Sequence, residues 1–435
     1  MKRLIDMLLG ADVEAPLFVG AGRPITAGEI RGRAASVTAR MANAGDRIYL
    51  HTTSAANFAA GLLAASALGK TIALPAHTQA AYLAEIGCAD AALVTDQHFS
   101  QNTEAIRDAA TDPLLVFFTS GSTGTPKPLD RNLSRIEIEA RALNDLWGAK
   151  AANVIATVSH QHIYGMIFRV AWPVMSGRLS DDMAATYWED LEGRFAGATL
   201  VSSPAHLTRL PPRADMFAPP PEQIFSSGQL LPFDAAQACT GALGKPVTEV
   251  LGSTETGGIA WRKQVSSDEP WTPFASVCVS RAEDGALAVR SPYLQTDGPQ
   301  HTGDGLDFLD DGRFRLKPRG DRVAKIDGKR VSLTRVEASL AALPEIDAAA
   351  ALTLPERREG ALRFDQTIQV RLQQDAHLIV VATGEQADLK KLWGRNPYGN
   401  MHPIAYTNPI FVDVDRNGFH ANGDTLGHPL LVAGK

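Results

Sequence analysis

A loop rich in glycine and hydroxyl residues follows an apolar run in the first third of the sequence. It reads Thr119-Ser120-Gly121-Ser122-Thr123-Gly124-Thr125-Pro126-Lys127 and comes directly after the apolar residues 114–118. Glycines let backbone N–H groups converge on an anion, the hydroxyl groups add donors, and Lys127 adds a positive charge. The spacing is not that of a Walker loop. The loop therefore predicts a site for phosphate groups, with a surface turn as the structural alternative.

Further polar segments follow in an order that resembles one enzyme family. They are His160-Gln161-His162-Ile163-Tyr164-Gly165-Met166, Ser226-Ser227-Gly228-Gln229-Leu230-Leu231-Pro232, Leu251-Gly252-Ser253-Thr254-Glu255-Thr256-Gly257-Gly258, Thr302-Gly303-Asp304 and Arg319-Gly320-Asp321-Arg322-Val323-Ala324-Lys325-Ile326-Asp327-Gly328-Lys329-Arg330-Val331. With the phosphate loop, they resemble the signature motifs of the adenylate-forming enzymes, which include acyl-CoA synthetases, aryl-CoA ligases, adenylation domains and luciferases. Because the matches keep their order over residues 119–337, the resemblance is specific.

The resemblance implies a reaction in two steps. The carboxylate of an aryl or acyl acid attacks the α-phosphate of ATP, which gives an acyl-adenylate and pyrophosphate. A thiol of coenzyme A or of a carrier-protein phosphopantetheine then captures the acyl group, so an acyl carrier protein is a candidate partner. One alternative is a nucleotide- or acyl-adenylate-binding homologue with impaired adenylation, and ATP-dependent thioester formation distinguishes the two. A stand-alone phosphate-binding scaffold is disfavoured because Glu255, Asp304 and Arg319 occur together.

The resemblance also assigns nucleotide and metal contacts. Glu255 would hold Mg²⁺, a hard cation that prefers carboxylate oxygen. Thr254 and Thr256 would lie against the nucleotide, with Thr256 on its phosphate. Asp304 would accept hydrogen bonds from both ribose hydroxyls, since one carboxylate offers two oxygens. The structural alternatives are a helix start at Glu255 and a turn at Asp304. The phosphate-loop contacts would be Thr119, Ser120, Gly121, Ser122, Thr123, Gly124 and Lys127.

Two further motifs would surround the adenine ring and the acid. The segment Ser227-Gly228 would flank adenine, because a glycine permits close approach. His162 would orient the acid or gate its pocket. A histidine that follows a buried strand is otherwise a structural residue, and this alternative applies more strongly to His160. Tyr164 and Gly165 would line the acyl tunnel.

The last motif would join two domains. Arg319 resembles an arginine that binds ribose at the domain junction, and Asp321 resembles the hinge about which a C-terminal domain rotates between adenylation and thiolation. Lys325 and the following segment resemble the face presented during thiol transfer. A charged hairpin with Asp327-Gly328 as its turn is compatible with that role. The predicted domains are therefore residues 1–320, which bind AMP, and a mobile C-terminal domain of residues 321–435.

The elements around these motifs predict an α/β fold. Strands are expected at residues 46–50, 71–74, 92–94, 114–118 and 154–158, with helices at 55–68 and 132–147. The apolar runs are typical of strands buried on both faces. Short alternating segments in residues 271–316 predict a small antiparallel, barrel-like subdomain. The prediction is a large N-terminal domain of α/β sheets plus this subdomain, followed by a smaller α+β domain.

Composition limits the possible partners. The 435 residues are 45% hydrophobic and 21% charged, which is ordinary for a globular protein. A net charge of -6 provides no basic field for nucleic acid or an anionic membrane. The three cysteines lack the spacing of a zinc site or a disulfide framework. No signal peptide is recognised, and the most apolar region is shorter than the roughly 20 residues that span a bilayer. We expect a soluble cytoplasmic protein that acts on a small molecule.

The tail departs from the family pattern. The family normally ends in a Pro-Arg-x-x-x-Gly-Lys-like segment, and no such segment follows Ala350. The lysines in this region are Lys390, Lys391 and Lys435, and residues from about 354 onward are atypical. Asp413, Asp415, Asn417, Gly418 and Asp424 match the spacing of a calcium loop. A hairpin turn is the preferred interpretation, because residues 409–412 are typical of a strand and not of the helix that precedes such a loop.

Overall fold

The computed structural model describes most of the first three quarters of the chain. The described residues are 1–10, 12–110, 112–120, 126–150, 153–282 and 285–317, together with short strands between residues 323 and 412. Contacts within the chain group it into one unit of Met1–Ser332 and another of Leu333–Lys435. The predicted hinge Asp321 lies outside the described residues, so the predicted boundary after residue 320 stays a prediction.

A five-stranded sheet occupies the N-terminal part of the first unit. Its order is β5-β3-β4-β6-β7, and the first four strands are parallel. Neighbouring residues such as Ile48 and Tyr49 are buried in different clusters, so the sheet is covered on both faces, as the apolar runs predict. The strands are β3 Arg47–His51, β4 Thr71–Leu74, β5 Leu93–Thr95, β6 Leu114–Ser120 and β7 Pro126–Asn132.

The strand β7 differs from the prediction of a loop over residues 119–127. β6 continues to Ser120, and β7 begins at Pro126 and pairs with it in antiparallel register. β7 is the edge strand of its sheet and has a neighbouring strand on one side only. Such a strand tolerates Pro126 and Pro128, which have no backbone N–H to donate. The phosphate loop is therefore carried by a hairpin. Its residues 121–125 lie outside the described part of the chain.

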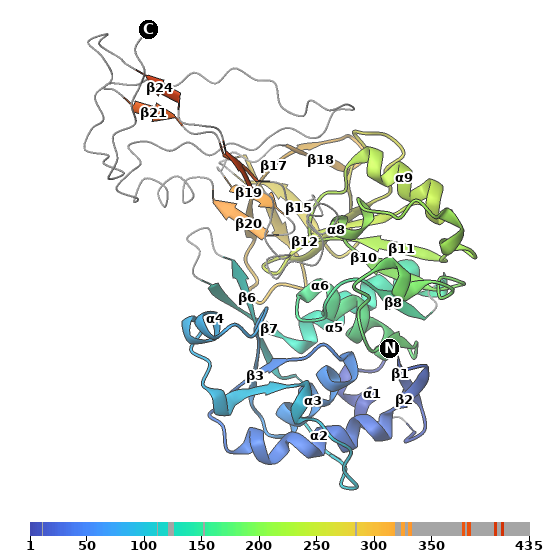
Figure 1. Cartoon of the computed structure of the whole chain (residues 1–435), viewed down its shortest axis with the longest axis vertical. Coiled ribbons are helices and arrows are strands. Elements are labelled where there is room, and N and C mark those ends of the chain that lie inside the picture. The colour runs from blue at the N-terminus through green and yellow to red at the C-terminus, as the bar shows by residue number, and fades with distance from the viewer. Residues whose placement is uncertain are drawn as a thin grey trace. The chain divides into compact units, whose positions relative to one another are not determined.

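A nine-stranded sheet forms the centre of the first unit, in the order β14-β13-β12-β11-β10-β8-β9-β1-β2. Within it, the strands β9, β8, β10, β11 and β12 run parallel to one another, so their carboxyl ends meet at one edge. Figure 1 shows β8, β10 and β11 side by side above the N-terminal elements. The strands are β1 Pro16–Gly20, β2 Arg23–Thr26, β8 Val154–Ala156, β9 Ser180–Asp181, β10 Thr199–Ser202, β11 Gln223–Ser226, β12 Thr248–Ser253, β13 Gly257–Arg262 and β14 Thr272–Pro273.

Two helices predicted from the sequence are present with nearly the expected bounds. α3 (Ala55–Ala67) packs on β3 and β4 and, as Figure 1 shows, lies beside α2 (Ala27–Ala42). α5 (Leu133–Trp147) buries the apolar residues Leu133, Ile136, Ala140 and Leu143 and also Glu137 and Glu139. The remaining helices are α1 Leu4–Gly10, α4 Ala80–Glu85, α6 Ile163–Met166, α7 Trp172–Met175, α8 Pro204–Leu207, α9 Phe233–Leu243 and a π-helical turn Ile167–Ala171; the 3₁₀ turns are Asp90–Ala92, Asp96–His98, Gly148–Lys150, Trp188–Leu191 and Ala214–Phe217.

A four-stranded antiparallel sheet follows, where short alternating strands were predicted. It contains β15 Cys278–Arg281, β16 Ala286–Arg290, β17 Gln300–Phe308 and β18 Phe314–Lys317. Next come β19 Val323–Ile326 and β20 Lys329–Ser332, which pair so that Ile326 lies opposite Lys329. The paired strands flank Asp327-Gly328, and these two residues of the predicted turn lie outside the described part of the chain.

The second unit is described only as two strand pairs. These are β21 Ala376–Leu378 with β24 Ile410–Val412, and β22 Val381–Thr383 with β23 Ile404–Tyr406. The strand predicted at residues 409–412 is therefore present as β24. The tail lysines and the calcium-like residues 413–424 lie outside the described residues. Within the part of the chain that is described, no helix has the length and apolarity needed to cross a membrane.

Candidate active site

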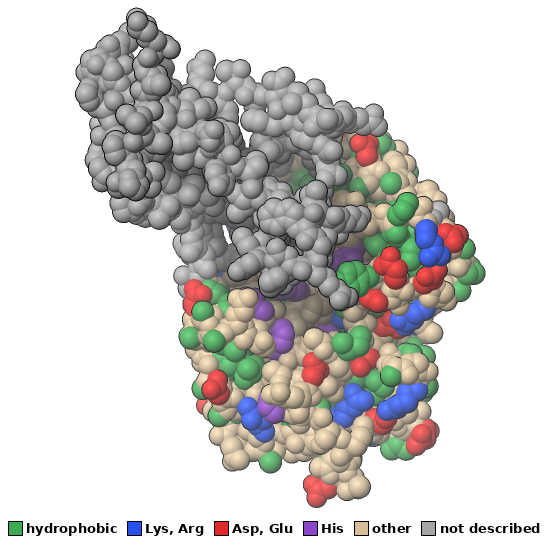
Figure 2. Space-filling model, viewed as in Figure 1, with side chains coloured by type: hydrophobic (Ala, Val, Ile, Leu, Met, Phe, Trp, Pro, Cys, Tyr) green, Lys and Arg blue, Asp and Glu red, His purple; other side chains and the backbone are tan. Residues whose placement is uncertain are grey.

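The carboxyl edge of the nine-stranded sheet carries three of the predicted segments. His162 follows β8, Ser227-Gly228 follows β11, and Thr254-Glu255 follows β12. Ligands of parallel α/β sheets bind in the crevice outside these strand ends. Figure 2 shows several histidine side chains on the displayed face, in a region with few acidic or basic side chains. The fold therefore brings together residues that are almost a hundred positions apart in the sequence.

The Ser227-Gly228 segment is held by its neighbour β12. Ser227 Oγ donates to the carbonyl oxygen of Val250 over 2.8 Å, and the Leu231 N–H donates to the buried carboxylate of Glu249 over 2.8 Å. Gly228 has a φ of +91°, which favours glycine, and no described atom lies within 4 Å of the position that a Cβ would take. The segment thus offers the open backbone that the predicted adenine contact requires.

Glu255 lies in a tight turn between β12 and β13. The turn is closed by Thr256, whose hydroxyl donates to the Gly257 carbonyl oxygen over 2.8 Å and accepts from the Ser253 N–H over 3.1 Å. Thr256 is fully buried, whereas Glu255 is half-buried. The turn therefore leaves the Glu255 carboxylate nearer to solvent. The phosphate contact of Thr256 stays a prediction, because its hydroxyl also has partners within the turn.

Two buried charged residues behind this turn were not among the predicted site residues. The guanidinium of Arg131, on β7, donates through Nε to the carbonyl oxygen of Thr254 over 2.9 Å. The carboxylate of Glu139, on α5, accepts from the Gly258 N–H over 2.9 Å. A signal was present in the sequence: Glu139 falls three residues after Ile136 and four before Leu143, on the apolar face of the helix. An ionisable residue at such a position indicates a specific buried partner.

His160 is a structural residue, which is the alternative that the sequence analysis favoured for it. It is fully buried, with Nε2 3.1 Å from Thr52 Oγ1 and Nδ1 3.3 Å from a nitrogen of Arg169. Because an arginine can only donate, Nδ1 accepts and Nε2–H donates to Thr52. Burial and the nearby Arg169 charge hold the pKa of His160 well below its ordinary value. His162, in contrast, is exposed and directly precedes α6. Within α6, a Cβ added to Gly165 would lie 1.9 Å from the carbonyl oxygen of Ser159.

The buried His160 predicts a loss of stability in mild acid. Since its pKa is lowered on folding, the unfolded chain takes up a proton below about pH 6.5 that the folded chain does not bind. We expect the urea midpoint to fall as the pH drops from 7.5 to 5.5, and His160→Gln to make this fall shallower. The exposed His77 supplies a control, and His77→Gln should keep the wild-type slope. Equal slopes in wild type and His160→Gln would contradict the assignment.

The other predicted residues lie on separate elements. Thr119 and Ser120 end β6, and Lys127 on β7 is exposed and pairs with Thr119 through the backbone. Asp304 lies in β17, where its N–H donates to Thr302 Oγ1 over 3.2 Å. Lys325 lies in β19 opposite Arg330. The remaining predicted residues lie outside the described part of the chain: Gly121, Ser122, Thr123, Gly124, Arg319 and Asp321.

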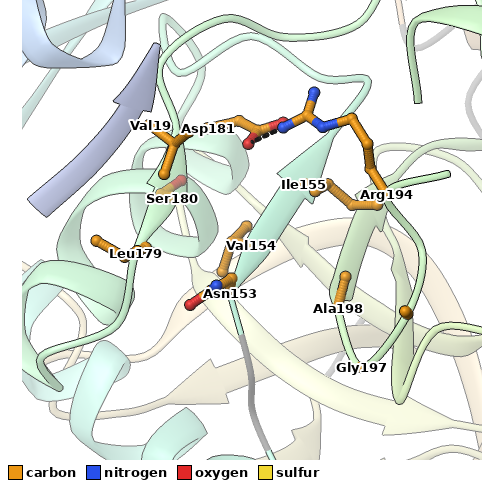
Figure 3. A pocket seen from close by; sticks show the side chains of 11 residues that line it. Val19, Asn153, Val154, Ile155, Leu179, Ser180, Asp181, Arg194, Gly197 and Ala198 are labelled. Carbon is orange, nitrogen blue, oxygen red and sulfur yellow. Dashed lines mark hydrogen bonds and ion pairs between the residues drawn. The ribbon is translucent and has the colours of Figure 1, made fainter. Parts of the chain in front are cut away.

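A cavity of about 450 Å³ lies at the opposite edge of the nine-stranded sheet. Figure 3 shows its lining, which includes residues that begin or directly precede β8, β9 and β10. An ion pair between Asp181 and Arg194 crosses its margin (Figure 3). Since this cavity is at the amino ends of the parallel strands, it is separate from the edge that carries Glu255.

Comparison with known proteins identifies the family. The model of a family described as "AMP-binding enzyme" matches residues 18–289, which include the phosphate loop, the histidine motif, the adenine segment and the Glu255 turn. The chain belongs to the AMP-binding enzyme family. The resemblance to adenylate-forming enzymes is thereby confirmed, as is the predicted α/β fold class.

Relatives within this family have named activities. The chain is 32% identical over 239 residues to a 4-coumarate–CoA ligase of Rhodobacter capsulatus, an alignment that covers 54% of this chain and 59% of that protein. It is 29% identical over 316 residues to a 4-coumarate–CoA ligase of Halorhodospira halophila, covering 68% and 72%. Among solved structures, a malonyl-CoA ligase with methylmalonyl-CoA and AMP bound is 20% identical with a TM-score of 0.63, covering 80% of this chain and 88% of that one. This last similarity concerns the fold.

Proposed function

We propose that the protein is an AMP-forming ligase that activates an aryl or acyl carboxylic acid with ATP and transfers the acyl group to a thiol. The observation that carries this proposal is the meeting of His162, Ser227-Gly228 and Glu255 at one carboxyl edge in a chain of the AMP-binding enzyme family. Relatives named as 4-coumarate–CoA ligases support an acid as substrate and coenzyme A as acceptor. A carrier-protein thiol remains the second acceptor to test.

Each predicted residue has a task in this reaction. Thr119, Ser120 and Lys127, with Gly121, Ser122, Thr123 and Gly124, would hold the phosphates, and Thr254 and Thr256 would border them. Ser227-Gly228 would flank adenine, Asp304 and Arg319 would bind the ribose, and His162 would orient the acid. In the second step, Lys325 would act in the thiolation arrangement reached by rotation about Asp321. With these roles we propose a domain of residues 1–320 and a C-terminal domain of residues 321–435.

Magnesium fits the chemistry of the Glu255 turn. The carboxylate is a hard oxygen ligand, half-buried at the end of β12. The described residues contain no group of three or more His, Cys, Asp or Glu side chains that could form a metal cage. Mg²⁺ commonly uses one or two carboxylates together with substrate phosphates. Glu255 would therefore hold Mg²⁺ on ATP, where the ion would neutralise phosphate charge.

Acid-dependent release of AMP tests the proposal. Purified protein is incubated with Mg-ATP, with and without coenzyme A or phosphopantetheinylated carrier protein, and with a panel of aryl, short-chain and long-chain acids. We expect AMP and a thioester only when acid, ATP and thiol are all present. Hydroxylamine replaces the thiol in a parallel assay to trap the acyl-adenylate. Tight ATP binding without AMP release from any acid would instead support the nucleotide-binding alternative.

A further inference from the structure

The turn that carries Glu255 is attached on its buried side to two elements far away in the sequence. β7 contributes Arg131, and α5 contributes Glu139. Their exposed fractions are 3% and 5%, so both side chains are removed from water. Removing a charge from water costs free energy unless polar partners replace the solvent. The partners that these two residues have are backbone groups of the turn and of one neighbouring segment.

Arg131 holds the first side of the turn. Its Nε and Nη2 both donate to the carbonyl oxygen of Thr254, the residue before Glu255, and its Nη1 donates to the carbonyl oxygen of Tyr293. The rigid guanidinium thus joins the turn to the segment that contains Tyr293. Burial lowers the pKa of Arg131, while the charges of Glu139 and Glu255 raise it. Both carboxylates are therefore near enough to interact with the guanidinium electrostatically.

Glu139 holds the second side. One carboxylate oxygen accepts from the Gly258 N–H over 2.9 Å. A Cβ on Gly257, whose φ is +67°, would lie 2.7 Å from the other oxygen, and a Cβ on Gly258 would lie 2.9 Å from the first. The two glycines therefore let the backbone approach the carboxylate closely. This contact explains why glycines occupy both positions at the start of β13.

We propose that Arg131 and Glu139 are positioning residues that fix the Thr254–Gly258 backbone and so aim Glu255 at the Mg²⁺–phosphate group. The inference rests on the proposed function for the identity of the group that Glu255 holds. The contacts described above carry the other part, which is that Arg131 and Glu139 brace the turn. A carboxylate held by one short turn can move by an ångström if either side is released, and such supporting contacts typically change metal affinity or activity by about ten- to a hundredfold.

Glu137 provides a matched control on the same helix. It is also buried, and its carboxylate also accepts from a backbone N–H, that of Leu4, over 2.7 Å. Its further partners are Arg3 and Arg141, neither of which belongs to the turn that carries Glu255. Burial raises the pKa of both Glu137 and Glu139. The two carboxylates thus share helix, burial and kind of partner, and differ in the segment that they hold.

The experiment compares Glu139→Leu, Glu139→Gln and Glu137→Leu by two independent readouts. The first is amide hydrogen exchange of peptides covering residues 250–262 in the protein without nucleotide. The second is Mg²⁺-dependence of acid-driven AMP release. We expect Glu139→Leu to speed exchange in this segment, to raise the Mg²⁺ concentration for half-maximal rate and to lower kcat about ten- to a hundredfold, with the KM for the acid little changed. Glu139→Gln should retain most of both properties, because its amide oxygen can accept from Gly258.

Glu137→Leu should leave both readouts at wild-type values even though it lowers the melting temperature. The bracing is refuted if Glu139→Leu exchanges like wild type, or if Glu137→Leu shows the same changes. If Glu139→Leu does not fold, Glu139→Asp replaces it, because its shorter side chain withdraws the acceptor from Gly258. If wild-type protein releases no AMP with any acid, the proposed function fails, and the exchange measurement still decides whether the two residues brace the turn. Faster exchange with an unchanged Mg²⁺ response would overturn the link to Glu255.

Discussion

Replacing Glu255 by glutamine should lower AMP-forming turnover at least about a hundredfold, or about 2.7 kcal/mol of transition-state stabilisation. Glutamine preserves the size of the side chain, and the turn is closed by the Thr256 and Ser253 contacts, which the change does not touch. Under the proposed function, the change removes the negative charge that would hold Mg²⁺ where charge develops on the phosphates. The measurement is kcat for acid-dependent AMP release at saturating Mg-ATP.

A surface carboxylate supplies the control for this prediction. Glu222 is about two-fifths exposed and pairs with Lys245 over 3.6 Å, outside the strand ends that carry the site. Glu222→Gln should therefore keep the wild-type turnover, and both variants should melt near the wild-type temperature. If Glu255→Gln turned over at the wild-type rate, Glu255 would not be the magnesium ligand. If it melted far below wild type, its lost activity would reflect unfolding.

The sequence predicts correctly those strands and helices whose apolar residues match their burial in the fold. The apolar runs at β3, β4 and β6 are buried on both faces, so their composition alone reports a covered parallel sheet. α3 is almost wholly buried and correspondingly apolar. The same reasoning fails at β7, where Pro126, Lys127 and Pro128 are atypical of a strand. Pairing with β6 at a sheet edge determines that strand, and such pairing leaves little trace in local composition.

In the candidate site, too, the sequence predicts local features and misses those that depend on contacts between distant segments. Motif spacing predicts roles for Glu255 and Ser227-Gly228, because each motif is contiguous in the sequence. It does not identify Arg131 or Glu139, since their partners lie 123 and 119 residues away. These contacts depend on how β7 and α5 pack against the turn between β12 and β13. In the sequence, only the position of Glu139 on an apolar helix face indicates that its carboxylate has a buried partner.

Replacing the buried Arg169 by methionine should lower the free energy of unfolding by about 3 to 5 kcal/mol, the range found when one partner of a buried charge arrangement is removed. Arg169 is fully buried in the π-helical turn between α6 and α7, and it donates to the carbonyl oxygens of Val158, Asp181 and Asp182 over 2.9, 3.2 and 3.3 Å. Burial lowers its pKa to about 10, so it remains charged at neutral pH. The measurement is urea unfolding at constant pH, with the slope checked against wild type.

Two companion variants separate the charge of Arg169 from its geometry. Arg169→Lys retains a positive charge, but a single ammonium cannot reproduce the fork that joins three carbonyl groups from two segments. We expect its midpoint to fall between those of wild type and Arg169→Met. Arg213, an exposed arginine paired with Glu192 and Asp215, is the control, and Arg213→Met should leave the midpoint unchanged because exposed pairs are screened by water. A midpoint for Arg169→Met equal to that of Arg213→Met would show that these carbonyl groups find other partners, and that Arg169 does not hold the segment before His162 in place.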